Sequence, residues 1–268
     1  MSQVILITGA SSGLGKATAE FLASKGYVVY GTIRNPSGEE LPFKMIRMDV
    51  TDEPSVTAAV NRVIDTEGKI DAVINNAGMH TAGAIESFTD QEVNLQMDTN
   101  FTGFVRVTRA VLPFMRAQGG GKIINISSIG GMIGLPFQGL YSAAKFAIEG
   151  YSEVLAMEVK PWNIKVVVIN PGDFKTGVTA NRIITKKDTE GSDYQQRIKK
   201  AVAIMGKDEQ SGYDPLVMAK TIEKIIRRKN PRYRFIVGRF DQRLIARIRH
   251  LLPPRLVRWI MADHYKVG

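Results

Sequence analysis

Cysteine is absent from this sequence of 268 residues. Neither a disulfide nor a thiolate metal site can form without it, and we predict no metal site. The first residues, MSQVILITGA, enter an apolar run at once and lack the charged start of a secretory signal. No apolar run approaches the roughly 20 residues of a membrane-spanning helix. We therefore expect a cytoplasmic protein.

Acidic residues are scarce in the last part of the chain. From residue 221 to 268 there are 13 Lys or Arg residues and only 3 acidic residues, and the net charge of the whole chain is +10. The first 220 residues are therefore balanced. Because the basicity belongs to this tail, it says little about the chemistry upstream.

Short apolar runs rich in β-branched residues alternate with stretches whose apolar residues recur every three or four positions. The runs lie at residues 4–8, 27–33, 43–48, 70–75, 121–127, 164–170 and 233–238. This alternation predicts one α/β domain over residues 1–268, a doubly wound Rossmann fold. We expect a seven-stranded parallel sheet in the order 3-2-1-4-5-6-7, with helices on both faces. A charged stretch without strand signals predicts a partly helical substrate lid at 174–212.

The first candidate site is the stretch ITGASSGLG, where a strand is followed by glycines 9, 13 and 15 and then by a helix. Glycines let the backbone turn tightly and approach a pyrophosphate, whose charge is met by the helix N-terminus. An ordinary glycine-rich turn is the alternative. The order of strand, turn and helix favours a nucleotide site. The predicted contacts are Gly9, Ser11, Ser12, Gly13, Leu14 and Gly15.

The end of the second strand bears on the cofactor. An acidic residue there would bind the ribose 2′-hydroxyl of NAD, but the sequence reads YGTIRN, with Arg34 in its place. Arginine pairs well with phosphate, so we favour NADP(H), with NAD(H) as the alternative. Asp49 is expected at the adenine edge, although an acid that caps a helix explains it nearly as well.

The second candidate site is YSAAK, in which Tyr141 and Lys145 lie four residues apart and share one face of a helix. A nearby ammonium and the positive nicotinamide of the cofactor favour the phenolate, so we expect the pKa of Tyr141 to fall from its usual value of about 10. Such a tyrosine can exchange a proton with a substrate oxygen. On spacing alone, two polar residues at a helix start remain the simpler interpretation.

Taken together, these motifs resemble those of the short-chain dehydrogenase/reductase family, over roughly residues 3 to 180. The chain has the cofactor turn T-G-x3-G-x-G from Thr8, the segment Asn75-Asn76-Ala77-Gly78, and the Y-x3-K motif. Asn100 in DTNFTG, Ser128 in NISSIGG, and Pro171-Gly172 with Thr176 also match. So many spaced motifs in unbroken order favour the catalytic interpretation of YSAAK.

The resemblance implies roles for individual residues. Tyr141 would be the general acid/base, and Ser128 would hydrogen-bond the reacting oxygen. Lys145 would hold the nicotinamide ribose, and Asn100 would anchor a water in a proton relay through a distortion of its helix. The segment from Asn75 to Gly78 would stabilise the sheet and line the adenosine-ribose side. The remaining cofactor contacts implied are Val50, Asn76, Ala77, Gly78, Tyr141, Lys145, Pro171, Gly172 and Thr176.

Within the family, the motifs look most like the branch of 17β-hydroxysteroid and retinol dehydrogenases. This implies an oxidoreductase for the alcohol or carbonyl of a bulky apolar substrate, such as a steroid, a retinoid or a lipid. Candidate pocket residues are Met79, Leu135, Phe137 and Val178. A homodimer or homotetramer through residues 100–117 and 141–160 is implied as well. The alternatives are an NAD-dependent alcohol dehydrogenase and a non-catalytic dinucleotide sensor.

Residues 239–268 form a basic, amphipathic extension, in which aliphatic residues at helical spacing alternate with arginines on either side of Pro253-Pro254. One prediction is a helical hairpin that caps the substrate pocket. The other is peripheral attachment to anionic lipid. Nucleic acid is not expected as a partner, because the basic residues interleave with aliphatic rather than aromatic side chains.

Overall fold

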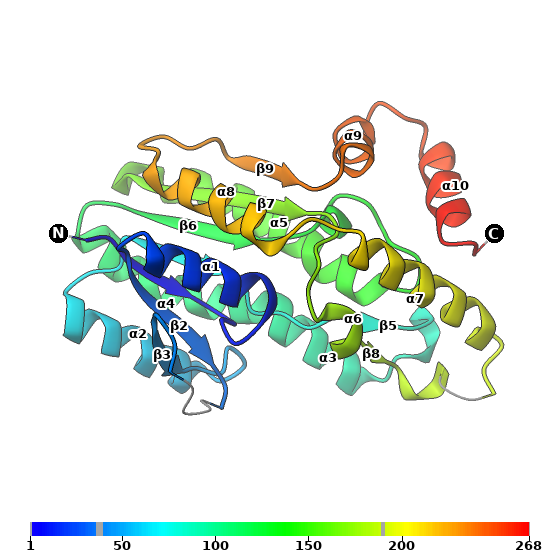
Figure 1. The fold of residues 1–268 in the computed structure, drawn as a ribbon, viewed down its shortest axis with the longest axis horizontal. Coiled ribbons are helices and arrows are strands. Elements are labelled where there is room, and N and C mark those ends of the chain that lie inside the picture. Colours follow the sequence, from blue (N-terminus) through cyan, green and yellow to red (C-terminus); the bar gives the residue numbers. More distant parts are fainter. Residues whose placement is uncertain (1, 36–39, 189–190, 268) are drawn as a thin grey trace.

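The computed structural model describes residues 2–35, 40–188 and 191–267. Its main sheet has seven parallel strands in the order β3-β2-β1-β4-β6-β7-β9 (Figure 1). Counted along the sheet's own strands, this is the predicted order, so the predicted fold is confirmed. The strands are β1 (Val4–Ile7), β2 (Val28–Ile33), β3 (Lys44–Arg47), β4 (Ala72–Asn75), β6 (Gly121–Ile126), β7 (Ile164–Pro171) and β9 (Arg234–Val237).

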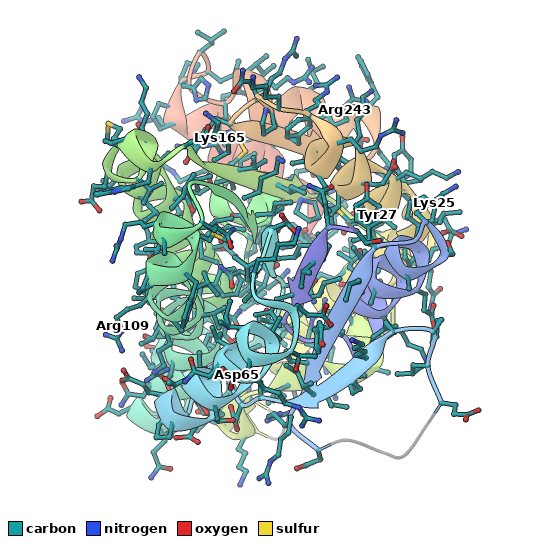
Figure 2. All side chains as sticks on the ribbon, turned by 90° about the vertical axis from the view of Figure 1, so that its left-hand side faces the viewer. Lys25, Tyr27, Asp65, Arg109, Lys165 and Arg243 are labelled. Atoms are coloured by element: carbon teal, nitrogen blue, oxygen red, sulfur yellow. The ribbon has the colours of Figure 1, made fainter. Side chains whose placement is uncertain are left out.

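Helices cover both faces of the sheet, as its apolar strands require. On β1, Val4 and Leu6 belong to one apolar layer and Ile5 and Ile7 to the other, because successive side chains of a strand point to opposite faces. The first layer packs on α2 (Glu53–Glu67), α4 (Gly103–Ala117) and α5 (Gly139–Glu158). The second packs on α1 (Gly13–Ser24) and α8 (Pro215–Arg227). Figure 2 shows Lys25, which follows α1, and Arg109 of α4 on opposite sides of the molecule.

The predicted lid contains a strand that the sequence did not reveal. Two residues, β8 (Ile183–Ile184), pair in parallel with β5 (Thr81–Ala82) and form a second, two-stranded sheet. Two residues are too few to show a period, which is why the sequence gives no signal for this strand. Around β8 lie α6 (Val178–Asn181), η5 (Lys186–Asp188) and α7 (Gln195–Gln210). Residues 189 and 190 lie outside the described part of the chain.

The basic tail folds as two helices, α9 (Phe240–Ile248) and α10 (Pro254–His264), beyond the edge strand β9 (Figure 1). Pro254 is the first residue of α10, a position where proline is tolerated. Tyr265 and Met261 pack with Ala201 and Met205 of α7. The tail therefore covers part of the lid, and residue 268 lies outside the described residues. In the described part of the chain, no helix is long and apolar enough to cross a membrane.

Candidate active site

A cavity of about 790 Å³ opens at the carboxyl ends of the sheet strands, where ligands of open α/β folds bind. It brings together nearly all the residues singled out in the sequence, although they come from segments far apart in the chain. The predicted residues that line it are Gly9, Ser11, Ser12, Gly13, Leu14, Arg34, Asp49, Val50, Asn76, Ala77, Gly78, Asn100, Ser128, Tyr141, Lys145, Pro171, Gly172 and Thr176.

The glycine turn has the backbone that a close approach to phosphate requires. Gly9 and Gly13 have φ angles of 67° and 56°, which favour glycine over other residues. A Cβ at Gly9 would lie 2.8 Å from the Cα of Ala77. Gly15 does not line the cavity; a Cβ there would lie 2.2 Å from the carbonyl oxygen of Gly9, so this glycine permits close packing of the helix on the turn.

The segment after β4 fixes this turn. Asn76 Nδ2 donates hydrogen bonds to the carbonyl oxygens of Thr8 and Gly9, at 2.9 and 3.0 Å. Asn75 points elsewhere: its Nδ2 donates to Asn125 Oδ1 at 2.8 Å, which links β4 to β6. The volume of the cavity and the backbone of the glycine turn, which a phosphate can approach closely, fit a nicotinamide dinucleotide in this half of the cavity.

Arg34 and Asp49 lie at the far end of the same half. Arg34 is exposed and follows β2 directly. Burial would raise the pKa of Asp49, but hydrogen bonds from Thr51 and the positive charges of Arg34 and Arg106 outweigh it and lower the pKa. An exposed guanidinium beside a carboxylate therefore marks the place where a ribose 2′-substituent would lie.

Asn100 lies in a distorted stretch of helix. Residues Asp98–Thr102 form a π-helical turn between α3 (Asp90–Met97) and α4. The side-chain amide of Asn100 makes two hydrogen bonds with the backbone of Met79. Asn100 Nδ2 donates to the carbonyl of Met79, and the Met79 N–H donates to Asn100 Oδ1, each at 2.8 Å. Such insertions often occur at functional sites. This one matches the helix distortion expected at Asn100.

Tyr141 is buried in the first turn of α5, close to Ser128. Burial raises its pKa to about 12, and a hydrogen bond with the Ser128 hydroxyl opposes the rise. The expected decrease of this pKa is thus wrong for the groups that the chain itself supplies. The spacing of four residues revealed the positive charge of Lys145 near Tyr141. It did not reveal that Tyr141 is buried, and burial disfavours the phenolate more strongly than the charge favours it. At neutral pH, Tyr141 is a phenol with a proton to donate.

Lys145 follows one helical turn after Tyr141. Its Nζ donates a hydrogen bond to the carbonyl of Ile126 at 2.8 Å and lies 5.7 Å from the centre of the Tyr141 ring. Burial lowers its pKa to about 8, and the charge of Glu149 opposes that decrease. The ammonium form therefore still prevails at pH 7.

The other half of the cavity has a mixed lining. Met79, Leu135 and Val178 line it, as predicted. Phe137 does not, because it packs with Leu135 on the lid and tail cluster and makes an edge contact with Tyr194. Among the lining residues that the sequence analysis did not single out, four have titratable side chains, namely His80, Asp173, Glu209 and Tyr265. His80 lies two residues after the recognised Asn-Asn-Ala-Gly segment, which is the only signal that pointed to it.

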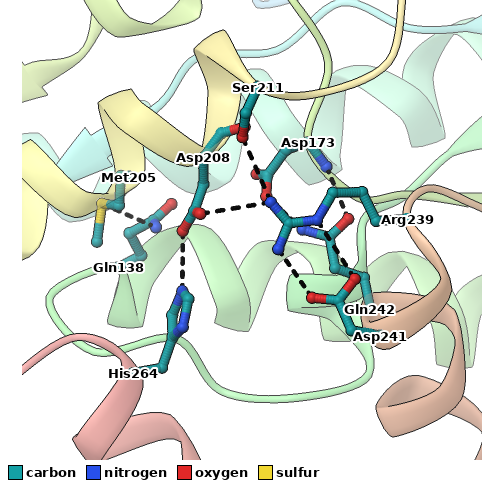
Figure 3. A network of polar contacts seen from close by, with 9 residues as sticks. All are labelled: Gln138, Asp173, Met205, Asp208, Ser211, Arg239, Asp241, Gln242 and His264. Atoms are coloured by element: carbon teal, nitrogen blue, oxygen red, sulfur yellow. Dashed lines mark hydrogen bonds and ion pairs between the residues drawn. The ribbon is translucent and has the colours of Figure 1, made fainter.

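Polar contacts fasten the tail to the lid beside this cavity (Figure 3). Asp208 of α7 accepts from His264 Nε2 at 2.8 Å and pairs with Arg239 at 3.6 Å. Gln242 of α9 bonds to the backbone and the side chain of Asp173. Tyr265, directly after α10, is 8% exposed and reaches the cavity wall. From the tail, Tyr265 lines the cavity, and the capping of the substrate pocket by the tail stays a prediction.

Comparison with known proteins places this geometry among dehydrogenases. The family model described as short chain dehydrogenase matches residues 3–187. A 3-ketodihydrosphingosine reductase of Bacteroides thetaiotaomicron is 48% identical over 265 residues, covering 99% of this chain and 98% of that protein. Human 17-beta-hydroxysteroid dehydrogenase type 1 is 36% identical over 65% of this chain and 57% of its own. The crystal structure of a short-chain dehydrogenase from Streptomyces avermitilis has a TM-score of 0.81 at 31% identity, with 100% of this chain and 97% of that chain covered.

Proposed function

Because this chain belongs to the short-chain dehydrogenase/reductase family and is an oxidoreductase, we propose that it reduces the ketone of a long-chain sphingoid base. The substrate class comes from the Bacteroides relative, which matches nearly the full length of both proteins. A 3-keto sphingoid base carries an amino group next to its ketone, a terminal hydroxyl and a long alkyl chain. The sequence analysis considered a steroid, a retinoid or a lipid as the apolar substrate, and this proposal selects the lipid.

The observation that carries the proposal is the arrangement of the cavity. Ser128, Tyr141 and Lys145 gather at its inner end, and the wall beyond them combines aliphatic side chains with a few polar ones. Met205 and Tyr265 extend that wall to the lid and the tail. A long alkyl chain can lie along such a wall while its polar end reaches Tyr141.

The chain's own residues can supply the proton that reduction of a ketone requires. In the proposed mechanism, the protonated phenol of Tyr141 donates its proton to the carbonyl oxygen as negative charge develops there. Ser128 hydrogen-bonds the same oxygen, and the Lys145 ammonium holds the nicotinamide ribose. Asn100, fixed by Met79, anchors a water that returns a proton to the tyrosine. The bound dinucleotide supplies the hydride.

We also propose NADPH as the preferred cofactor. The support is Arg34, exposed at the end of β2, where an NAD enzyme would need a carboxylate. Asp49, whose charge interacts with that of Arg34, would contact the adenine edge. An NAD-dependent alcohol dehydrogenase of the same fold is the alternative. A role as a sensor without catalysis has no support, because the chain is an enzyme of this family.

The substrate assignment has a direct test. The purified protein is expected to oxidise NADPH when 3-ketodihydrosphingosine is added in mixed micelles, with sphinganine as the product. Mass spectrometry identifies the product, and absorbance gives the rate. A steroid ketone and retinal, at matched concentration, are expected to react at least about tenfold more slowly, since one lost polar contact costs on the order of 1–2 kcal/mol. A faster rate with the steroid or with retinal would contradict the proposal.

The proposed assembly is a homodimer or homotetramer. Helix α5 exposes Phe146, Val154 and Met157, of which Met157 is 63% accessible to solvent. These apolar side chains lie within residues 141–160, one of the two segments that the family resemblance implicated. Burying them against a second copy would remove apolar surface from water.

The tail is proposed to contact membranes from one side. Its outer surface carries Phe240, Leu244, Leu251, Leu256 and Trp259, which are 75%, 44%, 79%, 40% and 65% exposed. Arginines interleave with them on both helices. Exposed apolar side chains among arginines suit the interface of an anionic bilayer, and a lipid substrate would be found there.

Flotation with vesicles tests this contact. The protein is expected to float with phosphatidylglycerol vesicles and to remain below with phosphatidylcholine vesicles, because arginines near an anionic surface contribute on the order of 1 kcal/mol each. The double variant Leu251→Asp, Trp259→Asp should lose flotation. Ile85→Asp removes an equally exposed apolar residue, 73% accessible, outside the tail and should float like the wild type. A double variant that still floats would contradict membrane contact through the tail.

A further inference from the structure

The imidazole of His80 lies against the ring of Tyr141. The two ring centres are 4.6 Å apart and the planes are inclined by 26°, so the rings are stacked. The backbone of His80 is held by the lid, since its carbonyl accepts from the N–H of Ile183 at 2.9 Å. The side chain is half-buried and lines the cavity. A polar ring thus lies beside the proton donor.

This ring has unused hydrogen-bonding capacity. In the part of the chain that the structure describes, neither nitrogen of the His80 ring has a hydrogen-bond partner. Burial lowers the pKa of His80 to about 3, and the charges of Lys145 and Arg182 contribute to the decrease. The imidazole is therefore neutral at physiological pH and offers one N–H donor and one acceptor nitrogen. Neither ring nitrogen is among the fully buried side-chain atoms that lack a partner, so both are accessible in the cavity, where a ligand group can pair with them.

We propose that His80 forms a polar subsite beside the reacting carbonyl, which binds a hydrogen-bond donor, such as an amino group, on the adjacent carbon of the substrate. This inference rests on the proposed function and names the part of the substrate that the enzyme recognises. Tyr141 fixes where the carbonyl oxygen lies, and the stacked imidazole is next to that position. The subsite therefore selects ketones with a polar neighbour over plain ketones.

The charges that act on His80 itself are positive, namely those of Lys145 and Arg182, so the subsite suits an uncharged amino group. Glu209 and Asp173 line the same cavity, and both act on Tyr141 through their negative charge. Glu209 is engaged by Thr179 and Arg182, whereas Asp173 bonds to the uncharged Gln242. An uncharged amino group would donate to the acceptor nitrogen of His80, with the two carboxylates on the wall beyond it.

Substitutions of His80 can separate its stacking on Tyr141 from its hydrogen bonding to the substrate. Stacking on Tyr141 needs only an aromatic ring, so His80→Phe retains it and removes both nitrogens. If His80 merely positioned Tyr141, the phenylalanine variant would behave like the wild type with every substrate. His80→Asn removes the ring and keeps a donor and an acceptor close to the backbone, which makes it the conservative counterpart for recognition.

The experiment measures kcat and KM with NADPH for two pairs of ketones. The first pair is 3-ketodihydrosphingosine and the long-chain 3-ketone of equal length without amino and hydroxyl groups. The second is aminoacetone and acetone. The wild type is expected to prefer the amino ketone of each pair by about tenfold or more in kcat/KM. In His80→Phe the preference should fall to within about twofold, mainly through KM, while the plain ketones keep their rates; His80→Asn should restore part of the preference.

The outcomes separate the two hypotheses. Equal use of both members of each pair by the wild type would overturn the subsite, and so would a His80→Phe variant that slows amino and plain ketones by the same factor. Reduction of 3-ketodihydrosphingosine without a preference would leave the proposed function intact. A preference within the short pair, without turnover of the sphingoid ketone, would support the subsite and overturn the proposed function. The wild-type comparison decides even if a variant fails to fold.

Discussion

Tyr141→Phe is expected to lower kcat for ketone reduction by about a thousandfold, which corresponds to roughly 4 kcal/mol of transition-state stabilisation. The substitution removes one oxygen and keeps the ring, including its stacking on His80. The reacting carbonyl loses its proton donor, while Ser128 still hydrogen-bonds it. The affinity for NADPH, read by fluorescence titration, should stay within about twofold of the wild type, because the phenol acts on the substrate. Steady-state absorbance gives kcat.

Tyr151→Phe is the matched control for this variant. Tyr151 lies on the same helix, α5, and burial raises the pKa of its phenol as well. Its ring makes an edge contact with Phe101, and it does not line the cavity. We therefore expect removal of the Tyr151 hydroxyl to leave kcat unchanged. Turnover by Tyr141→Phe within about tenfold of the wild type would exclude the phenol as the proton donor.

Much of the fold follows from local patterns. Strands such as β1 and β4 are nearly continuous apolar runs, and runs of this kind predict a parallel sheet covered on both faces. The sequence could not predict β5 and β8, because each has two residues and exists only through pairing with the other. Short strands of this sort depend on tertiary contacts, which leave no period in the sequence.

In the candidate site, too, local sequence patterns predict some features, and others depend on tertiary contacts. Motif spacing gathered Asn100, Ser128, Tyr141 and Lys145, and the cavity contains all four. It did not indicate Tyr265, which lines the cavity through the packing of the tail on Ala201 and Met205 of α7. It also gave the wrong direction for the pKa of Tyr141, since burial depends on the packed chain and not on the neighbouring lysine alone. The sequence therefore predicts which side chains carry the chemistry, but it does not predict the burial that shifts their pKa values.

Arg34→Asp is expected to reverse the cofactor preference. The wild type should use NADPH at least about tenfold better than NADH in kcat/KM, because a charge-assisted contact with phosphate contributes roughly 1.5–3 kcal/mol. An aspartate at this position would repel the 2′-phosphate and accept from a 2′-hydroxyl. We expect kcat/KM for NADPH to fall about a hundredfold, and the value for NADH to stay constant or rise. Initial rates with each cofactor, at fixed ketone concentration, measure both.

Arg47→Asp separates a local contact from the general effect of charge. Arg47 ends the neighbouring strand β3, is exposed like Arg34, and does not line the cavity. Both variants change the net charge by the same amount. A long-range effect would therefore lower NADPH use in both and would weaken with added salt, because exposed charges beyond about 10 Å are screened at 0.1 M ionic strength. A direct contact predicts the loss in Arg34→Asp alone. A wild type that binds NADH more tightly than NADPH would contradict the assignment, and Arg34 would then be a solvated residue at the end of β2.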